Sequence, residues 1–364
     1  MRTEKPAYLL LYESLRREIL AGDRPFGSRL PSRRSLAADR GVSPVTVDHS
    51  YELLCEEGYA EARPKSGYYV LYRAADGFSS VPPSLPENAP VTPAPAPSRS
   101  VFPFSVLART MRRVLSEQAE AILVKPPNTG CEALRQALSR YLSRSRGIHV
   151  SPDQIVIGPG AEYLYGLVVE LLGARRVYGV ESPSYAKIEQ VYRARGVDLE
   201  FLPLGRDGIR SDALRTTRAS VLHVTPFHSF PSGVTASVSR RQEYLRWAAG
   251  EDRYLVEDDY ESEFSLLRKP VDTLFSAAEK PGVIYLNTFS RTVSPAFRVG
   301  YMVLPRPLLP VFTVKAGFYS CAVPAFEQYV LAELLNSGDL ERHINRVRRL
   351  ERKGAVPARE HFDP

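Results

Sequence analysis

The chain has 364 residues, of which 44% are hydrophobic and 24% charged, and its formal net charge is +7. These values predict two or three globular domains and are compatible with a polyanionic partner, while the absence of a long apolar run or a signal-peptide pattern predicts no membrane segment and a cytoplasmic protein. The three cysteines and six histidines are too scattered for a disulfide framework or a metal cluster, so we expect no metal.

The N-terminal region predicts three helices followed by a short hairpin. Apolar residues recur at helical spacing over residues 8–21, and serines that can cap a helix precede two further helical patterns, 33–40 and 44–57. A Gly-Val-Ser turn joins these two helices, and strand-like residues on either side of a Pro/Gly turn follow over 59–71. Two helices joined by a short turn containing glycine form a helix-turn-helix, and the hairpin corresponds to a wing. We therefore predict a winged helix-turn-helix domain over residues 6–72.

Such a domain binds double-stranded DNA through the second helix of the motif, whose N-terminal residues face the base edges. The candidates for groove contact are Ser43, Val45, Thr46 and His49. The candidates for phosphate contact are Arg33, Arg34, Lys65 and the backbone amide of Gly67. The alternative is a three-helix interaction module with a solvated basic face.

The stretch LPSRRSLAADRGVSPVTVDHSYELLCEEGYAEARPKSGYYV resembles the winged-helix signature of the GntR family. The resemblance implies a DNA-binding transcriptional regulator. The chain departs from the family at Pro44 and Asp48, on a helix where many members carry arginine. Asp48 is expected to lie near a phosphate or to accept a hydrogen bond from a cytosine amine, and this argues against tight binding.

Three further segments follow the winged helix-turn-helix domain, which we call the head. Residues 73–100 are rich in proline and poor in large apolar side chains, which predicts an extended tether. Residues 101–350 alternate between helical and strand-like patterns, which predicts an α/β domain with a mainly parallel sheet, and 351–364 form a tail. The strand patterns of the α/β domain run into a glycine turn, a tyrosine-containing turn, a carboxylate cluster and a Ser/Arg loop, over residues 155–167, 177–188, 254–264 and 283–305.

The order of these segments resembles a fold-type I, class I/II aminotransferase domain in the form found in MocR-type regulators. In these GntR proteins a DNA-binding head is tethered to an aminotransferase-like body. The resemblance implies pyridoxal phosphate as a cofactor, a small amine or vitamer as effector, and a homodimer.

The resemblance also assigns cofactor-binding residues. Asp258 would pair with the pyridine nitrogen, Tyr260 would donate to the phenolic oxygen, and Tyr185 would lie beside the ring. The phosphate would be held by Gly160, Ala161, Ser290 and Arg298, the first two through their backbone amides. The alternatives are that Asp258 and Tyr260 simply end a strand and that Arg298 pairs with a carboxylate.

One position in the body departs decisively from the family motif, because Arg291 replaces the lysine that attaches the cofactor. A Schiff base needs an amine that can lose its proton, and an arginine with a pKa above about 12 cannot supply one. We therefore expect an inactive aminotransferase-like domain with no catalytic residue, in which pyridoxal phosphate binds non-covalently at most. The alternatives are a working aminotransferase and a truncated dimerisation protein, since the small C-terminal domain of the family is not found in this sequence.

A glutamate also stands in the phosphate turn, where Glu162 would repel a phosphate by roughly 1 kcal/mol at about 4 Å in water. One hypothesis is that Glu162 or another local carboxylate pairs with Arg291 and fills the pocket from within. The alternative is that Glu162 points outward, where its charge favours the helix dipole. A basic run near the end of the chain is predicted to be a solvated helical face, with Arg342, His343, Arg346 and Arg349 at helical spacing.

Overall fold

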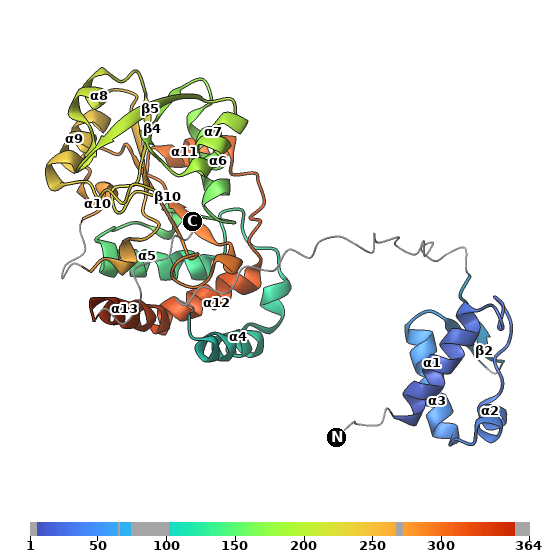
Figure 1. The fold of residues 1–364 in the computed structure, drawn as a ribbon. Coiled ribbons are helices and arrows are strands. Elements are labelled where there is room, and N and C mark those ends of the chain that lie inside the picture. Colours follow the sequence, from blue (N-terminus) through green and yellow to red (C-terminus); the bar gives the residue numbers. More distant parts are fainter. Residues whose placement is uncertain (1–5, 65, 74–101, 267–271, 354–364) are drawn as a thin grey trace, which may run out of the picture. The chain divides into compact units, whose positions relative to one another are not determined.

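The computed structural model describes residues 6–64, 66–73, 102–266 and 272–353. It divides the chain into two compact units, Met1–Ala94 and Pro95–Pro364, and each is described by itself (Figure 1). The predicted tether, apart from Arg73, lies outside the described residues, as do Lys65 and residues 354–364 of the predicted tail.

The N-terminal unit is a winged helix-turn-helix, as predicted. Its elements are α1 (Ala7–Leu20), α2 (Arg33–Arg40), α3 (Pro44–Glu56), β1 (Ala60–Arg63) and β2 (Gly67–Val70). The side chains of Ser32 and Ser43 each accept a hydrogen bond of 3.1 Å from a backbone N–H in the first turn of α2 and α3, so both serines act as N-caps. The two strands pair antiparallel from Ala60–Val70 to Arg63–Gly67.

A small hydrophobic core holds the three helices and the wing together. Leu15 of α1, Leu36 of α2 and Leu54 of α3 are all buried in it, and Val70 joins them from β2. Burying a leucine fully contributes roughly 1.5–3 kcal/mol, so a few such side chains account for much of the stability of a domain of this size.

The C-terminal unit is built on a mainly parallel eight-stranded sheet in the order β3-β10-β9-β8-β7-β4-β5-β6. The strands are β3 (Ile155–Gly158), β4 (Val177–Ser182), β5 (Asp198–Gly205), β6 (Gly208–Ile209), β7 (Val221–Val224), β8 (Tyr254–Asp258), β9 (Val283–Thr288) and β10 (Gly300–Val303). Strands β9, β8, β7, β4 and β5 run parallel, whereas β10 pairs antiparallel with β3 and β9, and β6 with β5. The predicted α/β class is confirmed.

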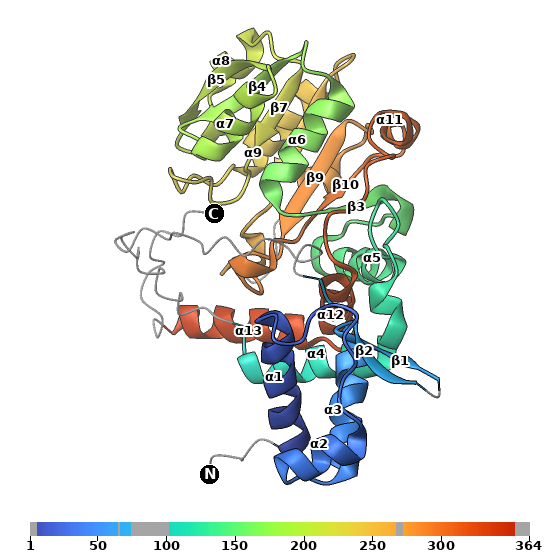
Figure 2. The same cartoon turned by 90° about the vertical axis from the view of Figure 1, so that its right-hand side faces the viewer.

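Helices cover both faces of this sheet (Figure 2). They are α4 (Phe104–Gln118), α5 (Glu132–Arg146), α6 (Ala161–Leu172), α7 (Ala186–Ala194), α8 (Ser211–Thr216), α9 (Val238–Ala248), α10 (Leu274–Ala277), α11 (Leu308–Lys315), α12 (Ala325–Asn336) and α13 (Asp339–Arg352), with short 3-10 turns between some of them. Because successive strand residues point to opposite faces, Ile284 and Leu286 of β9 pack toward α6, α7 and α11. Val283 and Tyr285 pack on the other face, toward the helices that include α5, α9 and α12.

Helix α13 corrects one sequence-based prediction. The three arginines of its basic run are exposed, as expected of a solvated face: Arg342, Arg346 and Arg349. His343, however, is only 3% exposed, and its ring lies 5.0 Å from that of Phe102. Burial, with a smaller effect of the neighbouring Arg346, lowers the pKa of His343 to about 4. His343 follows the buried Leu340 by three residues, so the helical period places it on the apolar side of the helix.

Three further expectations from the sequence concern a membrane segment, a metal site and a disulfide framework. Over the described ranges, no helix is both long and apolar enough to cross a bilayer. Within the same residues, no group of three or more His, Cys, Asp and Glu side chains is arranged to hold a metal ion. The thiols of Cys55, Cys131 and Cys321 are free.

Candidate functional site

Helix α3 presents the predicted base-contacting residues on the surface of the head. Ser43, Val45 and His49 are exposed, Val45 to 64%, and Thr46 is half-buried. The hydroxyls of Ser43 and Thr46 lie 2.9 Å apart in a shared hydrogen bond, so these two polar side chains act together. The remaining candidates lie on neighbouring elements, Arg33 and Arg34 exposed on α2 and Gly67 at the start of β2, while Lys65 lies outside the described residues. Exposure does not demonstrate DNA contact, so these assignments stay predictions.

Asp48 is engaged within the head rather than left free for a base. Its carboxylate accepts a hydrogen bond of 2.8 Å from Nη1 of Arg33, which links α3 to α2, and one of 3.5 Å from the Tyr68 hydroxyl. Because Arg33 is largely exposed, water screens this ion pair and it adds little to the stability of the domain. A DNA phosphate that binds Arg33 as predicted must therefore share this arginine with Asp48 or displace that carboxylate.

Arg29 is a further cation beside the wing, and the sequence did not mark it as a candidate. It forms a β-bridge with Tyr69, and a Cβ added to Gly67 would lie 3.2 Å from its Nε atom. Gly67 has a φ of +113°, a conformation that glycine adopts readily, and its missing side chain lets the guanidinium approach the wing. Arg29 lies in an irregular loop between α1 and α2, where no periodic pattern marks its role.

The body contains a cavity of about 270 Å³ at the carboxyl ends of β7 and β8, where α/β sheets commonly bind ligands. We call it the central cavity. Six of the seven predicted cofactor-binding residues line it: Ala161, Tyr185, Asp258, Tyr260, Ser290 and Arg298. Arg291 also lines it, together with Glu162, Tyr165, Lys187, Ile188, Thr225, Phe230, Thr288 and Pro295. The structure thus brings together residues that are more than a hundred positions apart in the sequence.

Gly160 lies beside the cavity, where it makes room for Arg298. Its φ is +92°, and an added Cβ would lie 3.0 Å from Nη2 of that arginine. The N–H of Gly160 donates to the carbonyl of Gly158 at 2.8 Å and is therefore already used. The first-turn amides of α6, including that of Ala161, have no acceptor within the helix and remain suited to an anion.

Asp258 ends β8 at the inner wall of the cavity and is 5% exposed. It accepts a hydrogen bond of 2.5 Å from the hydroxyl of Tyr165, and Nε2 of His223 lies 3.7 Å from the same oxygen. His223 in turn shares a hydrogen bond of 2.7 Å with the hydroxyl of Tyr192. Burial, with the nearby Asp258, raises the pKa of Tyr165, so this hydroxyl stays neutral. Sequence reasoning missed these three partners because their spacing is that of ordinary core residues.

Arg291 forms an ion pair with Glu261, which confirms that a local carboxylate engages it. The side chain of Glu261 is only 2% exposed and that of Arg291 19%, so the pair is largely buried. The second oxygen of Glu261 lies 2.8 Å from Nδ1 of His228. The hydroxyl of Tyr260 donates to the backbone carbonyl of His228 at 2.9 Å, which ties the same loop to the cavity wall.

Glu162 has two cationic neighbours at the cavity. One carboxylate oxygen lies 2.7 Å from Nζ of Lys187 and the other 3.7 Å from Nη2 of Arg298. Glu162 therefore neither pairs with Arg291 nor points away from the cavity. The alternative that Arg298 pairs with a carboxylate is correct in the structure. Sequence reasoning missed Lys187, because a lysine at the start of an amphipathic helix is normally a solvated residue.

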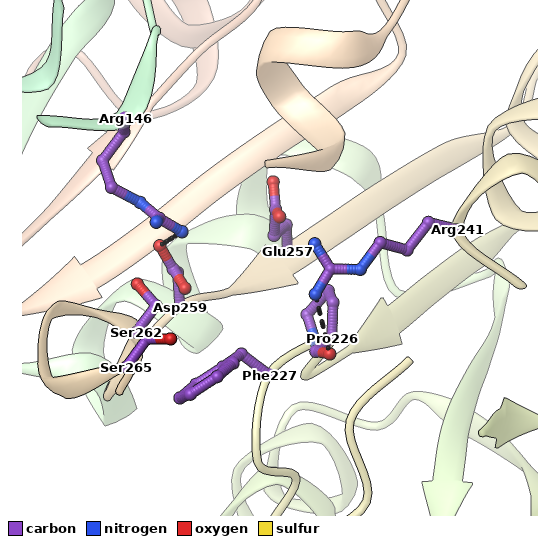
Figure 3. A pocket seen from close by; sticks show the side chains of 8 residues that line it. All are labelled: Arg146, Pro226, Phe227, Arg241, Glu257, Asp259, Ser262 and Ser265. Carbon is purple, nitrogen blue, oxygen red and sulfur yellow. Dashed lines mark hydrogen bonds and ion pairs between the residues drawn. The ribbon is translucent and has the colours of Figure 1, made fainter. Parts of the chain in front are cut away.

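The acidic residues on either side of Asp258 are held away from the cavity by a separate buried network. Figure 3 shows Arg146 reaching Asp259, to which it donates a hydrogen bond of 2.6 Å, and Arg241 near Glu257. Glu257 accepts hydrogen bonds of 2.7 and 2.9 Å from two backbone N–H groups at the start of α10. Burial, with the nearby Asp259, raises the pKa of Glu257 to about 7. The gap between these side chains is only about 10 Å³, enough for one water, so the network anchors the end of β8 rather than binding a ligand.

Both units match known families. Residues 7–70 match the family described as bacterial regulatory proteins, gntR family, and residues 98–355 match aminotransferase class I and II. The probable rhizopine catabolism regulatory protein MocR of Rhizobium meliloti is 30% identical over 95% of this chain and 75% of its own length. The pyridoxine biosynthesis transcriptional regulator PdxR of Corynebacterium glutamicum is 32% identical over 94% of this chain and 76% of its own length.

Solved aminotransferases share the fold of the body. The α-aminoadipate aminotransferase LysN of Thermus thermophilus has a TM-score of 0.63 and 28% identity, covering 71% of this chain and 67% of that one. The kynurenine aminotransferase of Pyrococcus horikoshii has a TM-score of 0.64 and 26% identity, covering 71% of this chain and 66% of that one. The chain therefore belongs to the GntR family of bacterial transcriptional regulators, in the MocR-type arrangement that joins a GntR winged helix to an aminotransferase class I and II domain.

Proposed function

We propose that this regulator binds double-stranded DNA with its winged helix and uses its aminotransferase-like domain as a non-covalent ligand sensor, not as an enzyme. The ligand is a phosphorylated pyridine vitamer or another small amine or anion. The observation that carries the proposal is Arg291, which stands in the lysine position and is paired with the buried Glu261. A guanidinium held by a carboxylate stays protonated and cannot attack an aldehyde.

The cavity residues fit pyridoxal phosphate held without a covalent bond. The guanidinium of Arg298 and the hydroxyl of Ser290 would hold the phosphate, beside the amide of Ala161. Asp258, buried at the inner wall, would face the ring nitrogen, and Tyr185 would lie beside the ring. When bound, this cofactor supplies a ring that withdraws electrons from an attached group. The related LysN structure contains N-(5′-phosphopyridoxyl)-L-leucine, a compound of the same class.

Lys187 is not a substitute for the missing lysine in this proposal. Its ammonium group donates a hydrogen bond of 2.7 Å to the carboxylate of Glu162 and is therefore engaged in an ion pair. Its role in the cavity is that of a cation.

Borohydride reduction tests the proposal directly. The full chain is mixed with pyridoxal phosphate, reduced, digested and mapped by mass spectrometry. We expect no pyridoxyl-lysine in the wild type, but retention of the unmodified compound in equilibrium dialysis, and a label at position 291 in the Arg291→Lys variant. A stoichiometric label on Lys187 or Lys315 of the wild type contradicts the non-covalent mode. No retention of vitamer, amine or phosphate in dialysis contradicts the sensing role.

We further propose that the protein acts in the cytoplasm as a homodimer. Large apolar side chains are exposed on the segments 123–128 and 314–318, which a hydrogen bond of 2.8 Å from the Asn128 side chain to the carbonyl of Gly317 joins. They are Leu123 at 82% exposure, Val124 at 66%, Val314 at 79% and Phe318 at 64%. Exposed apolar groups of this kind favour a protein interface. Sedimentation of the wild type and a Leu123→Asp variant tests this, since a wild-type monomer at micromolar concentration excludes the dimer.

A further inference from the structure

The carboxylate of Glu162 lies where the central cavity would receive an anion. It is the second residue of α6, and its two oxygens lie 2.7 Å from Nζ of Lys187 and 3.7 Å from Nη2 of Arg298. Ser290, the other residue assigned to the ligand's phosphate, lines the same cavity. The cations that would bind an anionic ligand are therefore already neutralised by a side chain of the protein.

These contacts are of a kind that a ligand can replace. The side chains of Glu162, Lys187 and Arg298 are 35%, 45% and 52% exposed, so water screens both ion pairs and each is weak. The Arg291–Glu261 pair differs, because Glu261 is 2% exposed and cannot be transferred to water at low cost. There are thus two sets of charges: Glu162 with Lys187 and Arg298, and Glu261 with Arg291. Only the first set can exchange its carboxylate for a ligand.

A phosphate group would satisfy both cations better than the carboxylate does. It carries up to two negative charges and three acceptor oxygens, and a guanidinium binds it in a bidentate manner. The positive end of the α6 dipole favours whichever anion lies at this helix terminus. A singly charged carboxylate ligand would replace one carboxylate by another and gain little.

We propose that Glu162 is an internal anion that competes with the ligand's phosphate for Lys187 and Arg298, so that the cavity selects phosphorylated ligands able to displace it. The inference rests on the proposed function and assigns two further roles within that site. Glu162 sets the affinity and the charge selectivity of the cavity, and Lys187 becomes a phosphate-binding residue once Glu162 has moved.

The test compares Glu162→Gln with Glu170→Gln in the full chain. Both variants remove one carboxylate from α6, but Glu170 pairs with Arg195 at 2.5 Å and does not line the cavity. Titration calorimetry measures binding of inorganic phosphate, pyridoxal phosphate and pyridoxal. Removing a like charge at contact distance predicts about tenfold tighter binding of the two phosphate compounds by Glu162→Gln. We expect unchanged binding of pyridoxal, which lacks the phosphate, and no change in Glu170→Gln.

A second substitution separates competition from a general effect of charge. Adding Lys187→Met to Glu162→Gln removes a cation that the proposal assigns to the phosphate, so the gain of about tenfold is expected to disappear. Glu162→Ser replaces Glu162→Gln if the latter does not fold. If the wild type binds pyridoxal phosphate and neither Glu162 variant binds it more tightly, this inference is wrong while the proposed function stands. If neither the wild type nor any folded variant binds a vitamer, amine or anion, the proposed function itself fails.

Discussion

Replacing Arg291 by methionine tests whether its pairing with Glu261 is part of the structure of the cavity. Methionine keeps most of the side-chain volume but removes the charge, which leaves a carboxylate that is only 2% exposed without its cation. Losing one partner of a buried pair costs about 3–5 kcal/mol. His228 remains 2.8 Å from Glu261 and Arg291 is 19% exposed, so we expect the free energy of unfolding of the body to fall by about 2–3 kcal/mol.

Each kcal/mol lowers the melting temperature by roughly 2–4 °C in a domain of this size, so calorimetry of the full chain is expected to show a fall of about 5–10 °C. The double variant Arg291→Met with Glu261→Gln removes both charges and is expected to recover about 2 kcal/mol of the loss.

The exposed pair Arg195–Glu170 provides the matched control for this double-mutant cycle. Its atoms lie 2.5 Å apart, but the two side chains are 41% and 42% exposed, so we expect a coupling energy below about 1 kcal/mol. If the coupling between Arg291 and Glu261 is no larger than that of the control pair, burial does not make their ion pair strong. In that case a ligand could separate Arg291 from Glu261 as readily as it could displace Glu162 from its cations.

Three further predictions concern the head and the buried acids of the body. Asp48→Asn frees Arg33 from its ion pair and is expected to tighten DNA binding severalfold on every sequence and to steepen its salt dependence in anisotropy titrations. Arg34→Ala is expected to weaken binding on all sequences, whereas Thr46→Ala alters the preference among sequences, as competition gel shifts would show. Burial raises the pKa of Glu181 to about 8, so the folded chain keeps a proton that the unfolded chain loses. Stability therefore falls as the pH rises from about 4.5 to 8, and Glu181→Gln is expected to flatten this fall in denaturation series.

The head was predictable from sequence because every signal in it is local. A serine that caps a helix lies next to the helix that it caps, and a stripe of leucines lies on one helical face. The predicted cap serines and the predicted apolar stripe over residues 8–21 both occur in the structure, for example at Ser43 and Leu15. The pair between Arg33 and Asp48 was not predicted, because it joins two helices whose relative orientation the sequence does not encode in any short pattern.

Most of the predicted cofactor-binding residues do line the central cavity, but the ion pairs between its residues were not predictable from the sequence. The family motif assigned Asp258 and Arg298 to one site, and the structure places both there. Which carboxylate pairs with Arg291 depended on distances across the cavity, and Glu261 rather than Glu162 is within reach. In the same way the period-two alternation of β8 sends the acids beside Asp258 to the opposite face, which a linear carboxylate cluster does not reveal.

The two sets of charges explain how an aminotransferase fold can become a sensor with few substitutions. A lysine that attaches a cofactor must be able to lose its proton, which arginine side chains in proteins do not do, and Arg291 is paired with the buried Glu261. We therefore propose that Arg291 removes the covalent chemistry, while its ion pair with Glu261 keeps the cavity filled at that point. At the other side, Glu162 occupies the cations without burying them, so a phosphate can still exchange with it. Under the proposed function, non-covalent binding of this kind responds to the concentration of the ligand. If Glu162 were as deeply buried as Glu261, the cavity would hold its internal anion permanently and sense nothing.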